Sequence, residues 1–137
     1  MYLLDTNVLS ELMRKQPDPE VVDRVRKTPA DHLWTSVVTL AELRSGACLR
    51  DDTGLFWKMI VERVLSRVRV LNLDERSAVV AGDILARLKK QGQPIGLADV
   101  MIGAIALVNG CAVVTRNRPH FDRIPGLHVP DWFVRRQ

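Results

Sequence analysis

Residues 2–9 have the sequence Tyr-Leu-Leu-Asp-Thr-Asn-Val-Leu, which joins an apolar run directly to a helix-like segment. The apolar residues at 2–4 are typical of a buried strand, and the apolar pair at 8 and 9 indicates that a helix follows at once. Asp5 therefore lies at the carboxyl end of the predicted strand. An acid between two buried elements is the first indication of a site.

The alternation of strand and helix continues along the chain. Short apolar segments at 33–35, 68–73 and 112–115 have the composition of strands, and 127–129 is expected to add a last short one. Helical patterns separate them, including a long helix that begins after Asp74 and ends near Gly92. This order predicts an α/β fold with a mostly parallel sheet covered on both faces. Ligands of such sheets bind at the carboxyl ends of the strands, so Asp5 and Asn117 should face the same crevice.

Three isolated acids, Asp5, Glu42 and Asp99, lie in apolar segments that normally exclude carboxylates. Each has a structural explanation of its own: Asp5 as a helix cap, Asp99 as a favourable charge in a first turn, and Glu42 as a surface acid. If the fold brings them within about 4 Å, each like-charged pair costs about 4 kcal/mol at an effective dielectric of about 20. A divalent cation is the simplest way to offset that cost.

Length and composition predict one domain over residues 1–137, with ordinary globular composition. The net charge of +4 is compatible with a polyanionic partner, although many other proteins carry a similar excess. Cys48 and Cys111 are expected to be reduced, buried thiols. The absence of a secretory pattern or a long apolar run predicts a soluble, cytoplasmic protein. Arg135 and Arg136 are expected to form a disordered basic end.

Four segments resemble the motifs of the PIN-domain ribonucleases, and within them the VapC toxins of toxin–antitoxin pairs. The segments are residues 4–11 (Leu-Asp-Thr-Asn-Val-Leu-Ser-Glu), 36–43 (Ser-Val-Val-Thr-Leu-Ala-Glu-Leu), 97–104 (Leu-Ala-Asp-Val-Met-Ile-Gly-Ala) and 114–117 (Val-Thr-Arg-Asn). The resemblance implies an α/β/α sandwich, a Mg²⁺ or Mn²⁺ site and cleavage of single-stranded RNA. It also implies a homodimer and a small antitoxin protein that docks across the active-site groove. DNA would be bound only indirectly, through the antitoxin.

By the same resemblance, Asp5, Glu42 and Asp99 match the three family acids, and Asn117 matches a fourth position that holds Asp or Asn. Polar residues that would support the carboxylates are Thr6, Asn7 and Thr115. Many relatives have a further acid directly before the Phe at position 121, where this chain has His120. Whether Asp122 takes over part of that role, and whether one or two ions bind, stays open.

The residue types suit this chemistry independently of the family. Oxygen ligands favour Mg²⁺ or Mn²⁺, and the lack of a His or Cys cluster argues against zinc. We expect Asp5 and Asp99 to hold the ion, Glu42 to bind it through water or a second ion, and Asn117 to complete the shell. A metal-activated water needs no histidine base, so the chain's histidines, His32, His120 and His128, are expected to be bystanders.

RNA also requires a surface that binds phosphates. Arg116, Arg118 and Arg44 are candidates, with solvated surface charge as the alternative for each. The three tryptophans, Trp34, Trp57 and Trp132, are expected in the core or at a dimer interface.

Two other functions fit parts of the pattern. A phosphatase of the haloacid-dehalogenase type would need an acid at position 7, where the chain has Asn7. A non-catalytic PIN-like module in a DNA-binding toxin–antitoxin repressor complex would keep the acids without turnover.

Overall fold

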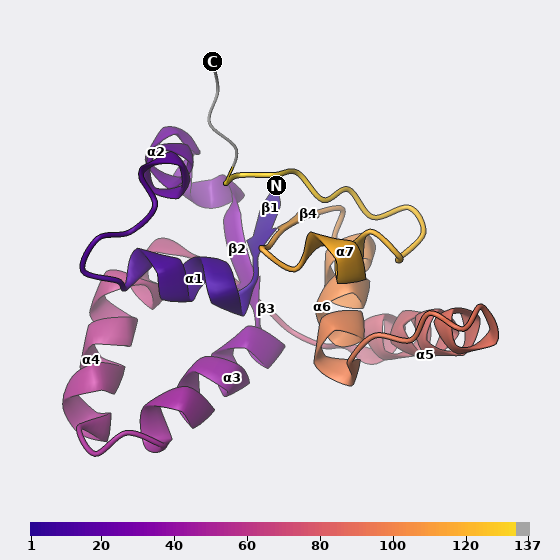
Figure 1. Ribbon diagram of the computed structural model, residues 1–137, viewed down its shortest axis with the longest axis horizontal. Helices are drawn as coiled ribbons and strands as arrows, with labels where there is room; N and C mark the ends of the chain where they lie inside the picture. Colours follow the sequence, from indigo (N-terminus) through magenta and orange to yellow (C-terminus); the bar gives the residue numbers. More distant parts are fainter. Residues whose placement is uncertain (134–137) are drawn as a thin grey trace.

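The computed structural model describes residues 1–133, which form a parallel sheet with strand order β3–β2–β1–β4 (Figure 1). The strands are β1 (Tyr2–Leu4), β2 (Leu33–Ser36), β3 (Arg69–Leu71) and β4 (Ala112–Val114). Tyr2 pairs with Leu33 on one side and Ala112 on the other, so β1 is a central strand. Because every pair is parallel, the four carboxyl ends meet at one edge of the sheet.

Helices lie between successive strands along the chain, and one more follows the last strand. They are α1 (Thr6–Leu12), α2 (Pro19–Lys27), α3 (Val37–Cys48), α4 (Thr53–Arg63), α5 (Glu75–Lys90), α6 (Leu97–Val108) and α7 (Arg118–Phe121), with short 3₁₀ turns at Ala30–His32 and Leu65–Arg67. The predicted long helix is α5, where the Asp74 side chain accepts a 2.8 Å hydrogen bond from the Ser77 amide. Gly92 follows its end with φ 68°, a conformation that glycine adopts without strain.

The sheet separates two hydrophobic cores because successive strand residues point to opposite faces. Leu3 and Val113 pack in the core beneath α5 and α6, whereas Leu4 and Val114 pack in the core beneath α1 to α4. Figure 1 shows α1 and α4 on one side of the strands and α5 to α7 on the other. The predicted three-layer α/β/α sandwich is confirmed, with a sheet that is parallel throughout.

The strand expected at 127–129 does not form. The segment is joined to β4 by a backbone hydrogen bond of 3.0 Å from the Val113 amide to the His128 carbonyl. Pro125 and Pro130 flank the segment, and proline has no amide hydrogen with which to extend a ladder. The prediction of a strand at 127–129 was therefore wrong, and the segment runs beside β4 as a loop.

The two cysteines are in different surroundings. Cys111 is buried and neither thiol is in a disulfide, as expected. Cys48 is exposed, so its predicted burial was wrong. It is the last residue of α3, and the buried face of that helix runs through Leu43 and Ala47 instead.

Trp132 is 2% exposed and its ring lies 5.1 Å from that of Tyr2, which confirms a core position. Trp57 packs partly buried at the edge of the core beneath α1 to α4, and Trp34 is half-buried. No helix among residues 1–133 is long and apolar enough to cross a membrane. The expectation for Arg135 and Arg136 lies outside the described residues.

Candidate active site

A cavity of about 570 Å³ lies at the edge of the sheet where β1 and β4 end. Its lining comes from the β1–α1 junction, from α3 and α6, and from the loop after β4. The residues that line it are Asp5, Thr6, Asn7, Ser10, Glu11, Arg14, Glu42, Asp99, Arg116 and Asn117. The fold thus gathers the three predicted acids, which are up to 94 positions apart (99 − 5) in the sequence, around one space.

Asp5 is held by the backbone and by two neighbouring side chains. As the N-cap of α1, its carboxylate accepts a 2.7 Å hydrogen bond from the Thr6 amide. Its other oxygen accepts hydrogen bonds from the Thr115 hydroxyl at 2.8 Å and the Asn7 amide nitrogen at 3.2 Å. Asp5 therefore caps a helix and also lines the cavity, so the structural and functional interpretations of this acid both apply.

The pKa of Asp5 is raised above its ordinary value of 3.8, first of all because the carboxyl group is buried. Hydrogen bonds from Thr115 and Thr6 lower this pKa, whereas the negative charges of Asp99 and Glu42 raise it further. The Asp5 carboxylate is thus close enough to Asp99 and to Glu42 to be repelled by both. A raised carboxyl pKa in a cleft lined by further acids is a common property of functional sites.

Glu42 and Asp99 face the same cavity from opposite helices. Glu42, exposed on α3, accepts a 2.7 Å hydrogen bond from the Thr6 hydroxyl. Asp99, in the first turn of α6, accepts a 3.0 Å hydrogen bond from the Asn117 side-chain amide. The predicted supporting residues therefore do contact the predicted acids. Thr115 itself is fully buried behind the cavity.

The donor set fits a divalent ion that prefers oxygen ligands. Three carboxylates line one space, and carboxylate oxygens are the ligands that Mg²⁺ and Mn²⁺ prefer. Within residues 1–133, no three Asp, Glu, His or Cys side chains lie close enough to form a complete ligand cluster as they stand. The carboxylates of Glu42 and Asp99 are each hydrogen-bonded to a neighbouring side chain instead.

Comparison with known proteins agrees with this geometry. A model of the PIN domain matches residues 2–127. The chain belongs to the PIN domain family. Its relatives include the tRNA(fMet)-specific endonuclease VapC of Salmonella typhimurium, which is 35% identical over 96% of this chain and 97% of its own length.

Solved structures place the fold in the same group. FitAcB from Neisseria gonorrhoeae matches with a TM-score of 0.89 and 30% identity, over 97% of this chain and 99% of the other. DNA-bound VapBC from Salmonella typhimurium matches with a TM-score of 0.85 and 33% identity, over 96% and 97%. The resemblance to the VapC group of PIN domains is confirmed.

Of the three arginines predicted to contact RNA, one lines the cavity of this PIN domain. Arg116 follows β4 and its backbone amide donates a 3.0 Å hydrogen bond to the Asn7 side chain. Arg118 instead donates to the Val129 carbonyl and lies 3.5 Å from the Asp131 carboxylate. Arg44 lies over the Trp57 ring, 5.0 Å from its centroid. Asp122 is exposed and is not among the residues that line the cavity.

His120 is not the bystander that we expected. Its Nδ1 atom lies 3.1 Å from the Asp99 carboxylate and 2.7 Å from the Asn117 amide nitrogen. The single turn of α7 places residues three apart on one face, so Asn117 and His120 reach Asp99 together. The spacing of three positions between Asn117 and His120 was the feature of the sequence that could have identified His120. His32 and His128 are exposed and line other parts of the surface.

Sequence reasoning also missed Glu11. It is 4% exposed in α1 and its carboxylate binds Arg14 and Arg116. Glu11 lies between the apolar residues Leu9 and Leu12, so it carries the same signal, an acid in an apolar segment, that identified the other three acids.

Proposed function

We propose that this PIN domain is a metal-dependent endoribonuclease and the toxin of a type II toxin–antitoxin pair. The observation that carries the proposal is the gathering of Asp5, Glu42 and Asp99 around one cavity at the carboxyl ends of the strands. The endonuclease name of the Salmonella relative supports nuclease activity for this chain as well. We expect the protein to act on RNA in the cytoplasm.

Mg²⁺, with Mn²⁺ as a substitute, is the ion that the donor set favours. Asp5 and Asp99 would hold it directly, Glu42 would reach it through water or a second ion, and Asn117 would complete the shell with its side-chain oxygen. When bound, such an ion lowers the pKa of a water ligand and offsets negative charge on the phosphate.

The protein's own side chains then have distinct tasks. Thr115, Thr6 and Asn7 hold the Asp5 carboxylate in one orientation through their hydrogen bonds. Asn117 donates a hydrogen bond to Asp99, and His120 Nδ1 lies 3.1 Å from the same carboxylate oxygen. Glu42, the exposed acid at the cavity, would orient the attacking water and accept its proton. Water oxygen forms the new bond to phosphorus as the bond to the leaving ribose oxygen breaks.

A partner protein is supported by an apolar groove that adjoins the acid cavity. Met13, Leu43, Phe56 and Ile60 line a space of about 470 Å³ between α1, α3 and α4, and Glu42 lines both spaces. An antitoxin segment with apolar side chains would bury them here and cover the acids at the same time. The solved structures of VapBC and FitAcB support a protein partner for this chain as well. The DNA-bound VapBC supports contact with DNA through that partner. The homodimer remains a proposal from the family resemblance.

Cleavage of a mixed pool of single-stranded RNA by the purified protein, freed of any partner, tests the proposal. We expect cleavage with Mg²⁺ or Mn²⁺, none with EDTA, and a loss of about 100-fold or more in Asp5→Asn and Asp99→Asn. Asp83→Asn, which removes an exposed acid from α5, is the matched control and should cleave as the wild type does.

Cleavage that persists in EDTA, or in both variants, would contradict the proposed site. If no form of the protein cuts RNA while it stays folded and binds Mn²⁺, the non-catalytic module in a repressor complex becomes the better account.

A further inference from the structure

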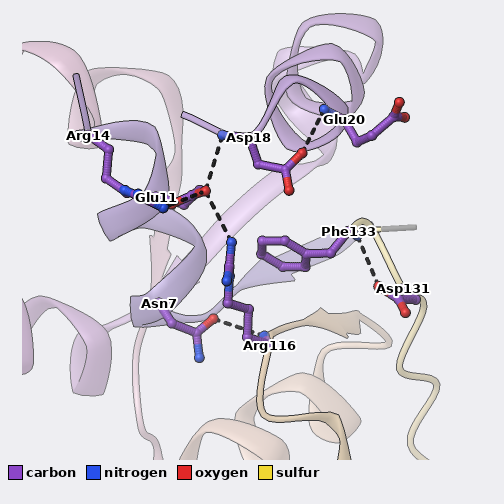
Figure 2. A network of polar contacts seen from close by, with 8 residues as sticks. All are labelled: Asn7, Glu11, Arg14, Asp18, Glu20, Arg116, Asp131 and Phe133. Atoms are coloured by element: carbon purple, nitrogen blue, oxygen red, sulfur yellow. Dashed lines mark hydrogen bonds and ion pairs between the residues drawn. The ribbon is translucent and has the colours of Figure 1, made fainter. Parts of the chain in front are cut away.

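Glu11 is a buried acid that binds two arginines at the rim of the cavity (Figure 2). One carboxylate oxygen accepts a 3.1 Å hydrogen bond from Arg116, and the other accepts a 3.0 Å hydrogen bond from Arg14. The Asp18 backbone amide also donates to this carboxylate, at 3.1 Å. The side chain of Glu11 is thereby fixed from three directions.

Arg116 is oriented by two further contacts. Its guanidinium carbon lies 4.2 Å from the centroid of the Phe133 ring, so the ring supports the guanidinium group. Its backbone amide donates to the Asn7 side chain, which also donates to Asp5. Figure 2 shows Arg116 between Glu11, Phe133 and Asn7. The position of this arginine is therefore linked to the position of the catalytic carboxylate.

Both arginines keep most of their hydrogen-bonding capacity. A guanidinium group has five N–H donors. Within residues 1–133, Glu11 is the only residue whose side chain or backbone accepts a hydrogen bond from either group. The side chains of Arg14 and Arg116 are 63% and 48% exposed, and both line the space that contains Asp5, Glu42 and Asp99.

Two arginines share the single carboxylate of Glu11, and within residues 1–133 neither guanidinium group forms an ion pair with a second acid. Planar guanidinium groups bind phosphate through two donors at once. An anion that enters the cavity therefore meets two guanidinium groups that are already oriented, those of Arg14 and Arg116, on the side where α1 faces the loop after β4.

We propose that Glu11 positions Arg14 and Arg116 as a pair that binds one backbone phosphate of the RNA, next to the phosphate that is cut. The inference rests on the proposed ribonuclease function and adds to it a positioning residue, Glu11, and a binding residue, Arg14. The pair sets the path of the strand across the site without selecting a base, because a phosphate contact carries no direct sequence information.

Binding of fluorescently labelled single-stranded RNA, measured by anisotropy over a series of salt concentrations, tests the pair. All variants carry Asp5→Asn so that the RNA stays intact. We expect Arg14→Gln and Arg116→Gln each to weaken binding about tenfold. Each should also lower the slope of log K against log salt by about 0.7, the value for one phosphate contact on a single strand.

Arg87→Gln on α5 is the matched control, because it removes an exposed positive charge from a helix that contributes no residue to the cavity. If Arg14→Gln behaves like Arg87→Gln while the parent protein binds RNA, the inference is wrong and the proposed function stands. If the Asp5→Asn parent fails to bind RNA, the inference is contradicted, whereas the proposed function is decided by the cleavage assay on the wild type.

Glu11→Gln separates positioning from neutralisation of the arginines. If Glu11 positions the pair, the Gln variant binds RNA more weakly while its salt slope is kept, because both charges remain. If Glu11 merely neutralises them, the variant binds more tightly with a steeper slope, and the positioning role is refuted. Arg14→Lys keeps the charge without the planar fork, so it provides a second test should Glu11→Gln unfold: weaker binding at an unchanged slope supports the pair, and wild-type affinity contradicts it.

Discussion

The hydroxyl of Thr115 donates a 2.8 Å hydrogen bond to the carboxylate of Asp5, which joins the ends of β4 and β1 across 110 positions of sequence. The same hydroxyl accepts a 2.9 Å hydrogen bond from the backbone amide of Asn117. Thr115 thus connects the carboxylate at the centre of the site to the loop that supplies Arg116 and Asn117. The relationship explains why a fully buried polar side chain directly follows β4.

Thr115→Val should weaken both the fold and the metal site. Loss of a hydrogen bond to a charged group costs about 2 kcal/mol. Loss of a partner that orients a metal ligand weakens metal binding about tenfold. Chemical denaturation and a Mn²⁺ titration measure the two effects, and Thr115→Ser, which keeps the hydroxyl, is the control. An unchanged Mn²⁺ affinity in the Val variant would show that Asp5 needs no such support.

The raised pKa of Asp5 predicts how stability depends on pH in the absence of metal. Because the pKa is higher in the folded state than the ordinary 3.8, ionisation of Asp5 opposes folding. Above the folded-state pKa, Asp5→Asn should be more stable than the wild type. This advantage should shrink as the pH falls through the folded-state pKa and disappear below 3.8, where Asp5 is protonated in the unfolded state as well.

Unfolding of the two proteins by urea in EDTA, between pH 7 and pH 3.5, measures this difference. Acids away from the site contribute equally to both proteins and cancel in this difference, whereas Asp99 and Glu42, which interact with Asp5, contribute to it. An advantage of Asp5→Asn that stays constant over this range would contradict a raised pKa for Asp5.

His120→Ala should reduce metal affinity without a large effect on folding. His120 is partly exposed, and its Nδ1 atom is one of two side-chain contacts of the Asp99 carboxylate. Loss of this contact is expected to weaken Mn²⁺ binding about tenfold, as is typical for partners of metal ligands. Calorimetry measures the affinity, with His128→Ala, an exposed histidine, as the control. Equal affinities in the two variants would return His120 to the role of bystander.

Glu42→Gln separates chemistry from stability. Glu42 is exposed, and a glutamine oxygen can still accept the hydrogen bond from Thr6, so the midpoint of thermal unfolding should not change. If Glu42 accepts a proton from the attacking water, the rate of RNA cleavage should fall about 100-fold or more. Glu62→Gln, which removes an exposed acid on α4, should leave the rate unchanged. A similar loss of rate in both variants would point to general charge and not to a role for Glu42.

Local pattern was sufficient to predict most of the fold. The apolar runs before Asp5 and Thr115 are short, and each is followed by polar residues where a parallel strand should end. The segment at 127–129 has the same apolar character but lies between prolines, and the pairing of a strand depends on neighbours that a local pattern does not contain.

The acids of the site were predictable because each interrupts an apolar segment. The direction in which each side chain points was not predictable, since it depends on how the elements lie relative to one another. Arg118 is only two positions after Arg116, yet it binds Asp131 and Val129 while Arg116 lines the cavity. Glu11 interrupts an apolar segment as the other acids do, but its partner Arg116 comes from the loop after β4. The contact of His120 with Asp99 likewise joins two elements, α7 and α6.

A titration of the partner-free protein with Mn²⁺, followed by calorimetry, tests the central claim that Asp5 and Asp99 hold a metal ion. We predict saturable binding by the wild type and by Asp83→Asn. Binding should be at least about tenfold weaker in Asp5→Asn and in Asp99→Asn, because each variant replaces a charged ligand by a neutral one. Wild-type affinity in both of these variants, with the proteins folded, would contradict the claim and show that the acid cavity is not the metal site.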